Sequence, residues 1–333
     1  MLGQEQSAGA GMKLFALDAS CYLGEPIAAA LGVALSPHEE RNFEDGEHKA
    51  RPLVSVRGAN AYVIHSLHGE PGNSANDRLV RLLFFIGALR QGGVRRITAV
   101  IPYLAYSRKD RQTKTRDPVS TRYTAEVIEA MVTDAVVTVD VHNIVAFQNA
   151  FRIDAWHLDT RRLVIDRLAP RLGEGSIAVA SPDPGGVKRA QLFREMLEDR
   201  LGRPVGVAFM EKRRSAGGTL VVGEVEGATA IVVDDMVSSG HTMVRAAEAL
   251  HAHGAGEVIA VAGHGLFTDG ADAVLERPEI ACWLVTDSMP PFRLPSELAA
   301  QRLEIVSAAP LLAEAIRRLQ EGGSLVELME GRA

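Results

Sequence analysis

The chain has 333 residues, 47% of them apolar, and a formal net charge of −6 at pH 7. This length favours two domains of ordinary size, and the dispersed charges of an acidic chain give no support for binding to nucleic acid or to anionic membranes. The two cysteines, Cys21 and Cys282, lack metal-ligand spacing and are too few for a disulfide scaffold. No apolar run reaches membrane-spanning length, and residues 1–11 lack the features of a signal peptide. We therefore expect a cytoplasmic protein with a disordered leader over residues 1–11.

Apolar, β-rich runs alternate with helical patterns in two successive rounds. The first round predicts strands at 13–17, 61–67, 96–103 and 135–141, and helices at 75–91 and 121–132. The second round predicts strands at 176–180, 205–210, 229–233, 257–262 and 281–285, and helices at 186–199 and 242–253. Strands separated by helices are typical of parallel, doubly wound sheets.

The predicted fold class is therefore α/β, with two similar domains that each contain a mainly parallel sheet flanked by helices. The pattern restarts near residues 155–160, which predicts an N-terminal domain at 12–157 and a C-terminal domain at 158–309. Residues 310–322 are predicted to form a helix, because a proline stands near the start and the apolar stripe should pack on a domain surface. Residues 323–333 form the predicted tail.

The most informative motif begins where an apolar run meets two adjacent carboxylates, Asp234 and Asp235. A hydroxyl-rich turn and then a helical pattern follow; the turn is Ser238, Ser239, Gly240, His241 and Thr242. In an α/β fold this motif lies at the carboxyl edge of the sheet, where ligands bind. The helix N-terminus suits a phosphate, and the carboxylates suit sugar hydroxyls or a hydrated Mg²⁺. The motif predicts a sugar-phosphate site, the alternative being an ordinary buried strand followed by a capped helix.

Two clusters in the first half have the chemistry of a nucleotide site. The aromatic and acidic segment of Phe43, Asp45, Gly46 and Glu47 could stack on a base and accept from its amino group, or form a plain polar turn. A cationic loop follows the predicted strand at 96–103, and its basic residues are Arg108, Lys109, Arg111, Lys114 and Arg116. Such a loop suits a polyphosphate, the alternative being a solvated charged loop.

Three further segments stand at predicted strand ends. His142 follows one strand, where an imidazole is a fair metal or phosphate ligand. Asp183 precedes a Gly-Gly turn that opens a helix, so it could hold Mg²⁺ or the ribose while the turn admits a ligand. Lys212 and Arg214 lead into a glycine-rich segment that could close over phosphates.

In this order, the motifs resemble those of the ribose-phosphate diphosphokinases, also called phosphoribosyl-diphosphate synthetases, over roughly residues 12–322. The resemblance implies two phosphoribosyltransferase-like domains and transfer of the β,γ-diphosphate of ATP to the C1 hydroxyl of ribose 5-phosphate. The products would be AMP and phosphoribosyl diphosphate, which serves nucleotide, histidine and tryptophan biosynthesis. The implied cofactor is Mg²⁺. The implied assembly is a homo-oligomer of at least two subunits, since the adenine segment usually serves a neighbouring subunit; tetramers and hexamers also occur in the family.

The resemblance assigns a role to each matching position. The positions implied to bind ATP are Phe43, Asp45, Gly46, Glu47, Arg108, Lys109 and His142. The positions implied to bind ribose 5-phosphate are Asp183, Asp234, Asp235, Ser238, Ser239, Gly240, His241 and Thr242. His142 and Asp183 are implied to be associated with Mg²⁺, and Lys212 and Arg214 to be the catalytic cations.

The chain also departs from the family pattern. His241 replaces a glycine of the ribose-phosphate loop, Lys109 a glutamine and Asn143 an alanine, and the segment from Lys212 to Asp234 is shorter than usual. Two alternatives to the leading reading follow: a non-catalytic regulatory or associated homologue, and a paralogue that acts on another pentose phosphate. A nucleobase phosphoribosyltransferase is disfavoured by the duplicated domain plan and the Arg108 loop.

Overall fold

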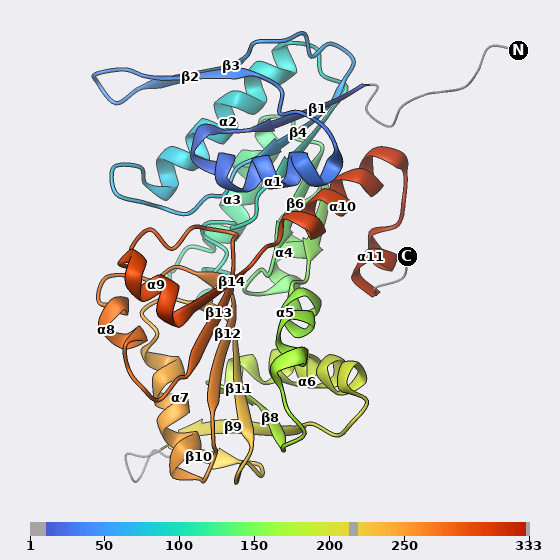
Figure 1. The fold of residues 1–333 in the computed structure, drawn as a ribbon. Helices are drawn as coiled ribbons and strands as arrows, with labels where there is room; N and C mark the ends of the chain where they lie inside the picture. Colours follow the sequence, from blue (N-terminus) through green and yellow to red (C-terminus); the bar gives the residue numbers. More distant parts are fainter. Residues whose placement is uncertain (1–10, 213–218, 331–333) are drawn as a thin grey trace, which may run out of the picture. The chain divides into compact units, whose positions relative to one another are not determined.

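The computed structural model describes residues 11–212 and 219–330. Two compact units make up the chain (Figure 1): unit 1 is Met1–Asp159 with Ala309–Ala333, and unit 2 is Thr160–Ala308. Both contain a sheet with helices on its faces, as the predicted fold class requires.

Unit 1 is built on a five-stranded parallel sheet. Its strand order is β1 (Met12–Ala16), β4 (Asn60–Ile64), β5 (Arg96–Val100), β6 (Ala135–Val139) and β7 (Asp154–Leu158). Its helices are η1 (Asp18–Ser20), α1 (Cys21–Leu31), α2 (Ala75–Gln91), α3 (Ser120–Ala130), α4 (Ile144–Ala150), α10 (Ala309–Glu321) and α11 (Leu325–Glu330). A separate antiparallel hairpin consists of β2 (His38–Asn42) and β3 (His48–Pro52).

Helix α2 shows how local sequence sets an element in this unit. Ser74 accepts a hydrogen bond from the Asp77 backbone, and the Asp77 side chain accepts one from the Ser74 backbone, which forms a capping box. Leu82, Phe85 and Leu89 are spaced three and four residues apart and are fully buried. The cap and the apolar stripe together explain why the helix spans the predicted residues 75–91.

The C-terminal helix α10 packs on unit 1 rather than on the unit that precedes it in the chain. It lies beside α1 (Figure 1), and Arg317 Nη2 donates to the carbonyl of Ala30 at 3.1 Å. Asn60 Nδ2 and the Tyr62 hydroxyl donate to Gln320 Oε1 at 3.1 Å and 3.3 Å. The predicted helix therefore joins a surface formed by residues more than 250 positions earlier, and α11 lies within the predicted tail.

Unit 2 is built on a seven-stranded sheet. Its strand order is β10 (Thr219–Val222), β9 (Gly206–Lys212), β8 (Ile177–Ser181), β11 (Thr229–Val237), β12 (Val258–Gly265), β13 (Cys282–Thr286) and β14 (Leu303–Val306). Only the β9–β10 pair is antiparallel among the described strands of this sheet. Its helices are α5 (Arg161–Leu168), η2 (Ala169–Arg171), η3 (Pro184–Gly186), α6 (Val187–Leu201), α7 (His241–Ala252), α8 (Ala271–Leu275) and α9 (Ser296–Arg302).

Side-chain alternation divides the interior of unit 2 into two cores. Along β8, Ala178 and Ala180 belong to the core that includes α7, whereas Ile177 and Val179 belong to the core that includes α5 and α6. Successive side chains of a strand point to opposite faces, so a strand covered on both faces is apolar throughout. This covering explains the continuous apolar runs of the sequence.

The strand order of unit 2 reverses between β8 and β11. From β8 the chain moves outward to β9 and β10, then returns to β11 and proceeds in the other direction to β14. Ligands of open α/β sheets bind outside the carboxyl ends of the strands at such a reversal. The candidate ligand site of unit 2 therefore lies at the ends of β8 and β11.

Neither cysteine is in a disulfide, and no helix among residues 11–212 and 219–330 has the length and apolarity needed to cross a membrane.

Candidate active site

The two adjacent carboxylates lie inside β11 and not beyond its end. The sequence predicted a strand that stops at residue 233, but β11 continues to Val237. Its pairing with β8 ends at Val232, whereas its pairing with β12 continues from Asp234 to Val237. The strand is longer than predicted because its polar end pairs with β12. On the side that faces β8, β11 has no paired strand from residue 233 onward.

The carboxylates of Asp234 and Asp235 share one guanidinium. Arg189 Nη1 donates to Asp234 Oδ1 at 2.9 Å, and Nη2 lies 3.6 Å from Asp235 Oδ1. The Asp235 backbone N–H also donates to Asp234 Oδ1, at 2.8 Å. Burial raises the pKa of Asp234 to about 7, with the Asp235 carboxyl adding to the rise and Arg189 opposing it. A buried carboxylate with a strongly raised pKa marks a candidate functional site.

The predicted phosphate loop contains a glycine that the fold requires, directly before the first residue of α7. Gly240 has a φ of 82°, and a Cβ on it would lie 2.9 Å from Val274 Cγ1. His241 is the exposed first residue of the 12-residue helix α7, so the strained backbone falls on Gly240 and not on the histidine. Ser238 is fixed by its carbonyl, which accepts from the Thr268 N–H at 3.0 Å. The loop therefore leads from β11 into the N-terminus of α7, the kind of element that suits an anion.

The turn after β8 is organised by the carboxylate of Asp183. Asp183 Oδ1 accepts from the N–H groups of Gly185 and Gly186 at 2.8 Å and 3.1 Å. Those N–H groups are thereby used inside the turn, so the expected approach of a ligand to the Gly-Gly backbone is not supported by these contacts. Oδ2 has no hydrogen bond among the described residues, and a hard carboxylate oxygen of this kind fits a hydrated Mg²⁺.

One cavity joins the two predicted ligand segments of unit 2. It has a volume of about 110 Å³ and is lined by Asp183 of the β8 turn, Met210 of β9, and Thr242 and Arg245 of α7. Arg245 Nη2 lies 3.4 Å from Thr242 Oγ1, so this cation points back toward the helix N-terminus. The structure thus brings together Asp183 and Thr242, which the sequence placed in separate motifs.

In unit 1 the predicted cationic pair has two different environments. Arg108 is exposed, whereas Lys109 Nζ pairs with Asp117 Oδ2 at 2.9 Å and contacts Thr113 Oγ1 at 3.1 Å. Hydrogen bonds from Thr113 and Lys109 hold the pKa of Asp117 well below its usual value. Arg108 therefore remains presented at the surface while Lys109 stabilises the loop.

The His142 turn is tied to the Arg108 loop by Asn143. Asn143 Nδ2 donates to Asp110 Oδ2 at 2.6 Å, and its Oδ1 accepts from the N–H groups of Val145 and Ala146 at the start of α4. This asparagine, which departs from the family pattern, thus caps the helix and links two predicted ATP segments. His142 is exposed beside it.

We predict that Asn143→Ala lowers the free energy of unfolding by about 1–2 kcal/mol, because it removes the cap and the bond to Asp110. Urea unfolding measures this change. Asn149→Ala is the matched control: Asn149 is exposed in the same helix, where its Nδ2 donates to the Val145 carbonyl. A loss from Asn149→Ala as large as that from Asn143→Ala would contradict the capping role.

The predicted adenine segment forms the exposed turn of the β2–β3 hairpin. The Phe43 N–H donates to the Glu47 carbonyl at 2.8 Å, the Glu47 N–H to Asp45 Oδ1 at 3.0 Å, and Gly46 has a φ of 90°. The Phe43 ring is 40% exposed, with the Arg41 guanidinium 5.3 Å from its centroid. A ring held this way at a hairpin tip is available to stack on a base.

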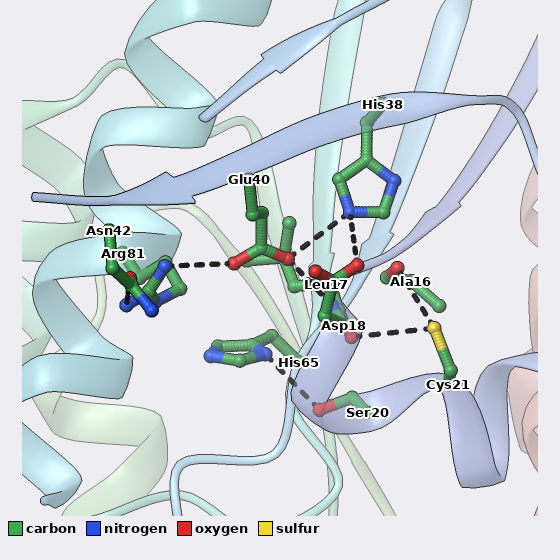
Figure 2. Close-up of polar contacts among 10 residues, drawn as sticks. All are labelled: Ala16, Leu17, Asp18, Ser20, Cys21, His38, Glu40, Asn42, His65 and Arg81. Carbon is green, nitrogen blue, oxygen red and sulfur yellow. Dashed lines mark hydrogen bonds and ion pairs between the residues drawn. The ribbon is translucent and has the colours of Figure 1, made fainter. Parts of the chain in front are cut away.

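Sequence reasoning missed a polar cluster in unit 1 (Figure 2). His38 Nε2 lies 3.1 Å from Glu40 Oε1 and 3.4 Å from Asp18 Oδ1, and ligand atoms of these three residues lie within 4.8 Å of one another. That spacing could hold a metal ion. However, Glu40 Oε1 already accepts from the Asp18 N–H at 2.6 Å, and Oε2 from Arg81 at 3.2 Å. The carboxylate of Glu40 therefore already has hydrogen-bond donors, and the cluster forms a network that links β2 to α2. The spacing of these residues in the sequence does not predict it.

The predicted catalytic cations fall at the edge of the described chain. Lys212 is the last residue of β9, and its side chain lies outside the described residues. Arg214 lies wholly outside them.

Comparisons with known proteins extend over nearly the whole chain. Residues 12–131 match the N-terminal domain of ribose phosphate pyrophosphokinase, and residues 206–330 match the phosphoribosyl synthetase-associated domain. The ribose-phosphate pyrophosphokinase of Aquifex aeolicus is 37% identical over 320 residues, 96% of this chain and 99% of that protein. The enzyme of the same name from Hyphomonas neptunium is 36% identical over 323 residues, 96% of this chain and 100% of that protein.

A solved structure gives the same result. The crystal structure of phosphoribosylpyrophosphate synthetase from Mycobacterium smegmatis matches with a TM-score of 0.85 and 34% identity, covering 94% of this chain and 100% of that one. The predicted α/β fold class is thereby confirmed. Together with the motifs at the ends of β5, β6, β8 and β11, these matches mean that the chain belongs to the ribose-phosphate pyrophosphokinase family.

Proposed function

We propose that this chain transfers the β,γ-diphosphate of ATP to the C1 hydroxyl of ribose 5-phosphate, with Mg²⁺, to give phosphoribosyl diphosphate and AMP. The observation that carries the proposal is the Asp234–Asp235 pair at the strand reversal of unit 2, followed directly by the turn that leads into the N-terminus of α7. Relatives that span 96% of the chain are named for this activity. The matches to ribose-phosphate pyrophosphokinases do not favour the alternative of a non-catalytic homologue.

Ribose 5-phosphate is proposed to bind to unit 2. The carboxylates of Asp234 and Asp235 would accept from the sugar hydroxyls. The 5-phosphate would lie at the N-terminus of α7, within reach of N–H groups and hydroxyls of Ser238, Ser239, Gly240, His241 and Thr242.

ATP is proposed to bind to unit 1. Exposed Arg108 would contact the phosphates, with Lys109 holding the loop and His142 beside it on the turn that Asn143 fixes. The adenine would stack on Phe43 and donate from its amino group to acceptors of the Asp45–Glu47 turn. An exposed hairpin turn of this kind suits a base held by a neighbouring subunit, so we propose a homo-oligomer of at least two chains.

The proposed transfer of diphosphate needs no oxidant or reductant. The C1 oxygen bonds to the β-phosphorus, the bond between that phosphorus and the bridging oxygen to the α-phosphate breaks, AMP leaves, and the C1 hydroxyl proton passes to solvent. Bound Mg²⁺ would neutralise phosphate charge; the Asp183 carboxylate suits it, as does the His142 imidazole through water. The protein's own contribution is to orient both substrates and to surround the transferred group with cations.

An assay for AMP release tests the proposal. Purified protein with ATP, Mg²⁺ and ribose 5-phosphate should form AMP and phosphoribosyl diphosphate in equal amounts. Product from another pentose phosphate but not from ribose 5-phosphate would identify an altered substrate. Nucleotide binding without AMP release would identify a regulatory homologue and refute the proposed activity.

We propose that Lys212 and Arg214 stabilise the charge of the transition state. Lys212→Ala is expected to leave folding intact and to lower turnover about 10²-fold or more, as for the loss of one electrostatic stabiliser. Turnover under saturating substrates is the measurement, with Lys13→Ala in β1, which belongs to none of the ligand motifs, as the control. Near-normal turnover in Lys212→Ala would exclude this role.

A further inference from the structure

Arg189 stands between the two segments of unit 2 that flank the strand reversal. It is the third residue of α6, which follows the β8 turn, yet its guanidinium reaches the carboxylates of β11. Arg189 and Asp234 are 45 residues apart in the sequence. None of the sequence motifs assigned this arginine a role.

Arg189 contributes one of the two hydrogen bonds that hold an oxygen of the Asp234 carboxylate. Asp234 Oδ1 accepts from Arg189 Nη1 at 2.9 Å and from the Asp235 backbone N–H at 2.8 Å. Two donors from different elements, α6 and β11, therefore hold the position of this oxygen. The second guanidinium nitrogen lies 3.6 Å from Asp235 Oδ1, so one planar fork spans both acidic residues.

The guanidinium of Arg189 also lies close to the turn after β8. A Cβ on Gly186 would lie 2.7 Å from Ser181 Oγ, which is too close, and 3.6 Å from Arg189 Nη1, which is an ordinary contact. The glycine is therefore required by the approach of Ser181, and Arg189 packs beside the turn without depending on it.

The charges explain why a cation is needed there. The side chains of Asp234 and Asp235 are only 20% and 6% exposed, and they are adjacent in one strand. Two carboxylates in such a place repel each other and lose hydration, and a nearby cation offsets both costs. Arg189 is the cation that both carboxylates contact in this structure.

We propose that Arg189 is a positioning residue for ribose 5-phosphate: it holds the Asp234 carboxylate in the orientation that receives the sugar hydroxyls. This inference rests on the proposed function, because it takes the sugar to bind at Asp234. Arg189 acts through Asp234 and does not itself take part in diphosphate transfer.

Substitution at Arg189 should therefore affect one substrate. Arg189→Gln is expected to raise the KM and the calorimetric Kd for ribose 5-phosphate about 10- to 100-fold, while the KM for ATP stays the same. Arg189→Lys should recover part of the loss, since a lysine supplies the charge but not the fork. In an Asp234→Asn background, Arg189→Gln should cause little further loss, because the carboxylate on which it acts is already gone.

Arg194→Gln is the matched control. Arg194 lies on the same helix and is 24% exposed, close to the 25% of Arg189, but it pairs with Glu198 one turn away at 2.6 Å. This variant should keep wild-type constants for both substrates. Thermal unfolding of all variants separates loss of fold from loss of binding.

The possible outcomes separate this inference from the proposed function. An unchanged Kd for ribose 5-phosphate in Arg189→Gln, an equal rise in both KM values, or full additivity with Asp234→Asn would overturn the role of Arg189. If the wild-type protein binds ribose 5-phosphate but releases no AMP, the proposed reaction is refuted. If Arg189→Gln then also loses that binding, the positioning role of Arg189 is still supported. Normal wild-type turnover, together with a loss of ribose 5-phosphate binding in Arg189→Gln that is not additive with Asp234→Asn, supports both the proposed reaction and the role of Arg189.

Discussion

Replacing Asp234 by asparagine should lower activity and raise stability in the same protein. The kcat/KM for ribose 5-phosphate is expected to fall about 10²-fold, because a charged acceptor for the sugar hydroxyls is lost. The thermal midpoint at pH 8 should nevertheless rise. The wild-type carboxylate is ionised there although burial and Asp235 raise its pKa to about 7, and the asparagine carries no such charge.

The sign of the pH dependence follows from the direction of that shift. An unfolded aspartate has a pKa of about 3.9. Between about pH 4 and pH 7 the folded protein therefore holds a proton that the unfolded chain has released, so this group makes the free energy of unfolding fall as pH rises through that window and level off above it. At pH 8 the asparagine variant should be more stable by on the order of 2 kcal/mol, since loss of the Arg189 pair offsets part of the relief.

Thermal unfolding at pH 5 and pH 8 tests this prediction, with the difference between variant and wild type growing toward pH 8. Asp166→Asn is the control, because Asp166 is 49% exposed in unit 2 and pairs with Arg200 at 2.8 Å. It should change stability by less than about 1 kcal/mol at either pH, as an exposed ion pair does. A lower midpoint for Asp234→Asn at pH 8, or an equal difference at both pH values, would show that Asp234 is not strained by its burial.

Replacing Arg78 by methionine should cause the largest loss of stability that we predict for unit 1. The Arg78 side chain is fully buried, with Nη2 2.6 Å from Glu70 Oε1. Its Nη1 donates to the carbonyls of Ser66 at 3.1 Å and Ala19 at 3.4 Å. Methionine fills the space but leaves these acceptors without a donor, so we expect a loss of about 3–5 kcal/mol.

Urea unfolding gives the free energy for this comparison. Arg122→Met is the control in the same unit: Arg122 is 66% exposed and pairs with Glu126 at 2.9 Å on the surface of α3. The free energy of unfolding of Arg122→Met should lie within about 0.5 kcal/mol of the wild-type value. If both variants lost the same amount, the loss would reflect the removal of charge and not the buried contacts of Arg78.

A helix or strand of this protein could be predicted from the sequence where the residues that determine it lie within one segment. Residues 75–91 form a helix as predicted, because the capping box of Ser74 and Asp77 and the apolar stripe lie within that segment. The hairpin of residues 38–52 was not predicted as strands, because its cross-strand partners are polar, such as Glu39 opposite Arg51. Polar pairs of this kind leave no apolar alternation to read.

The candidate site divides in the same way. The Asp234–Asp235 motif, the helix after it and the Gly240 turn were readable, because a strand, a turn and a helix N-terminus follow one another in the chain. The extension of β11 to Val237 could not be predicted, because the strand with which it pairs, β12, lies more than twenty residues later in the chain. The hydrogen bonds from the Gly185 and Gly186 N–H groups to Asp183 could not be predicted either, because they depend on the conformation of the turn.

By itself, the sequence determined the fold class, the family and the order of the ligand motifs, because strand and helix periodicity and strand–turn–helix chemistry are local properties. Only the tertiary structure decided which residues meet. It placed Arg189 on Asp234, Asn143 on Asp110, and α10 on unit 1, all through contacts between segments far apart in the chain. Such contacts depend on how strands are ordered and how helices cover the sheet, and a residue's neighbours in sequence carry no record of that order.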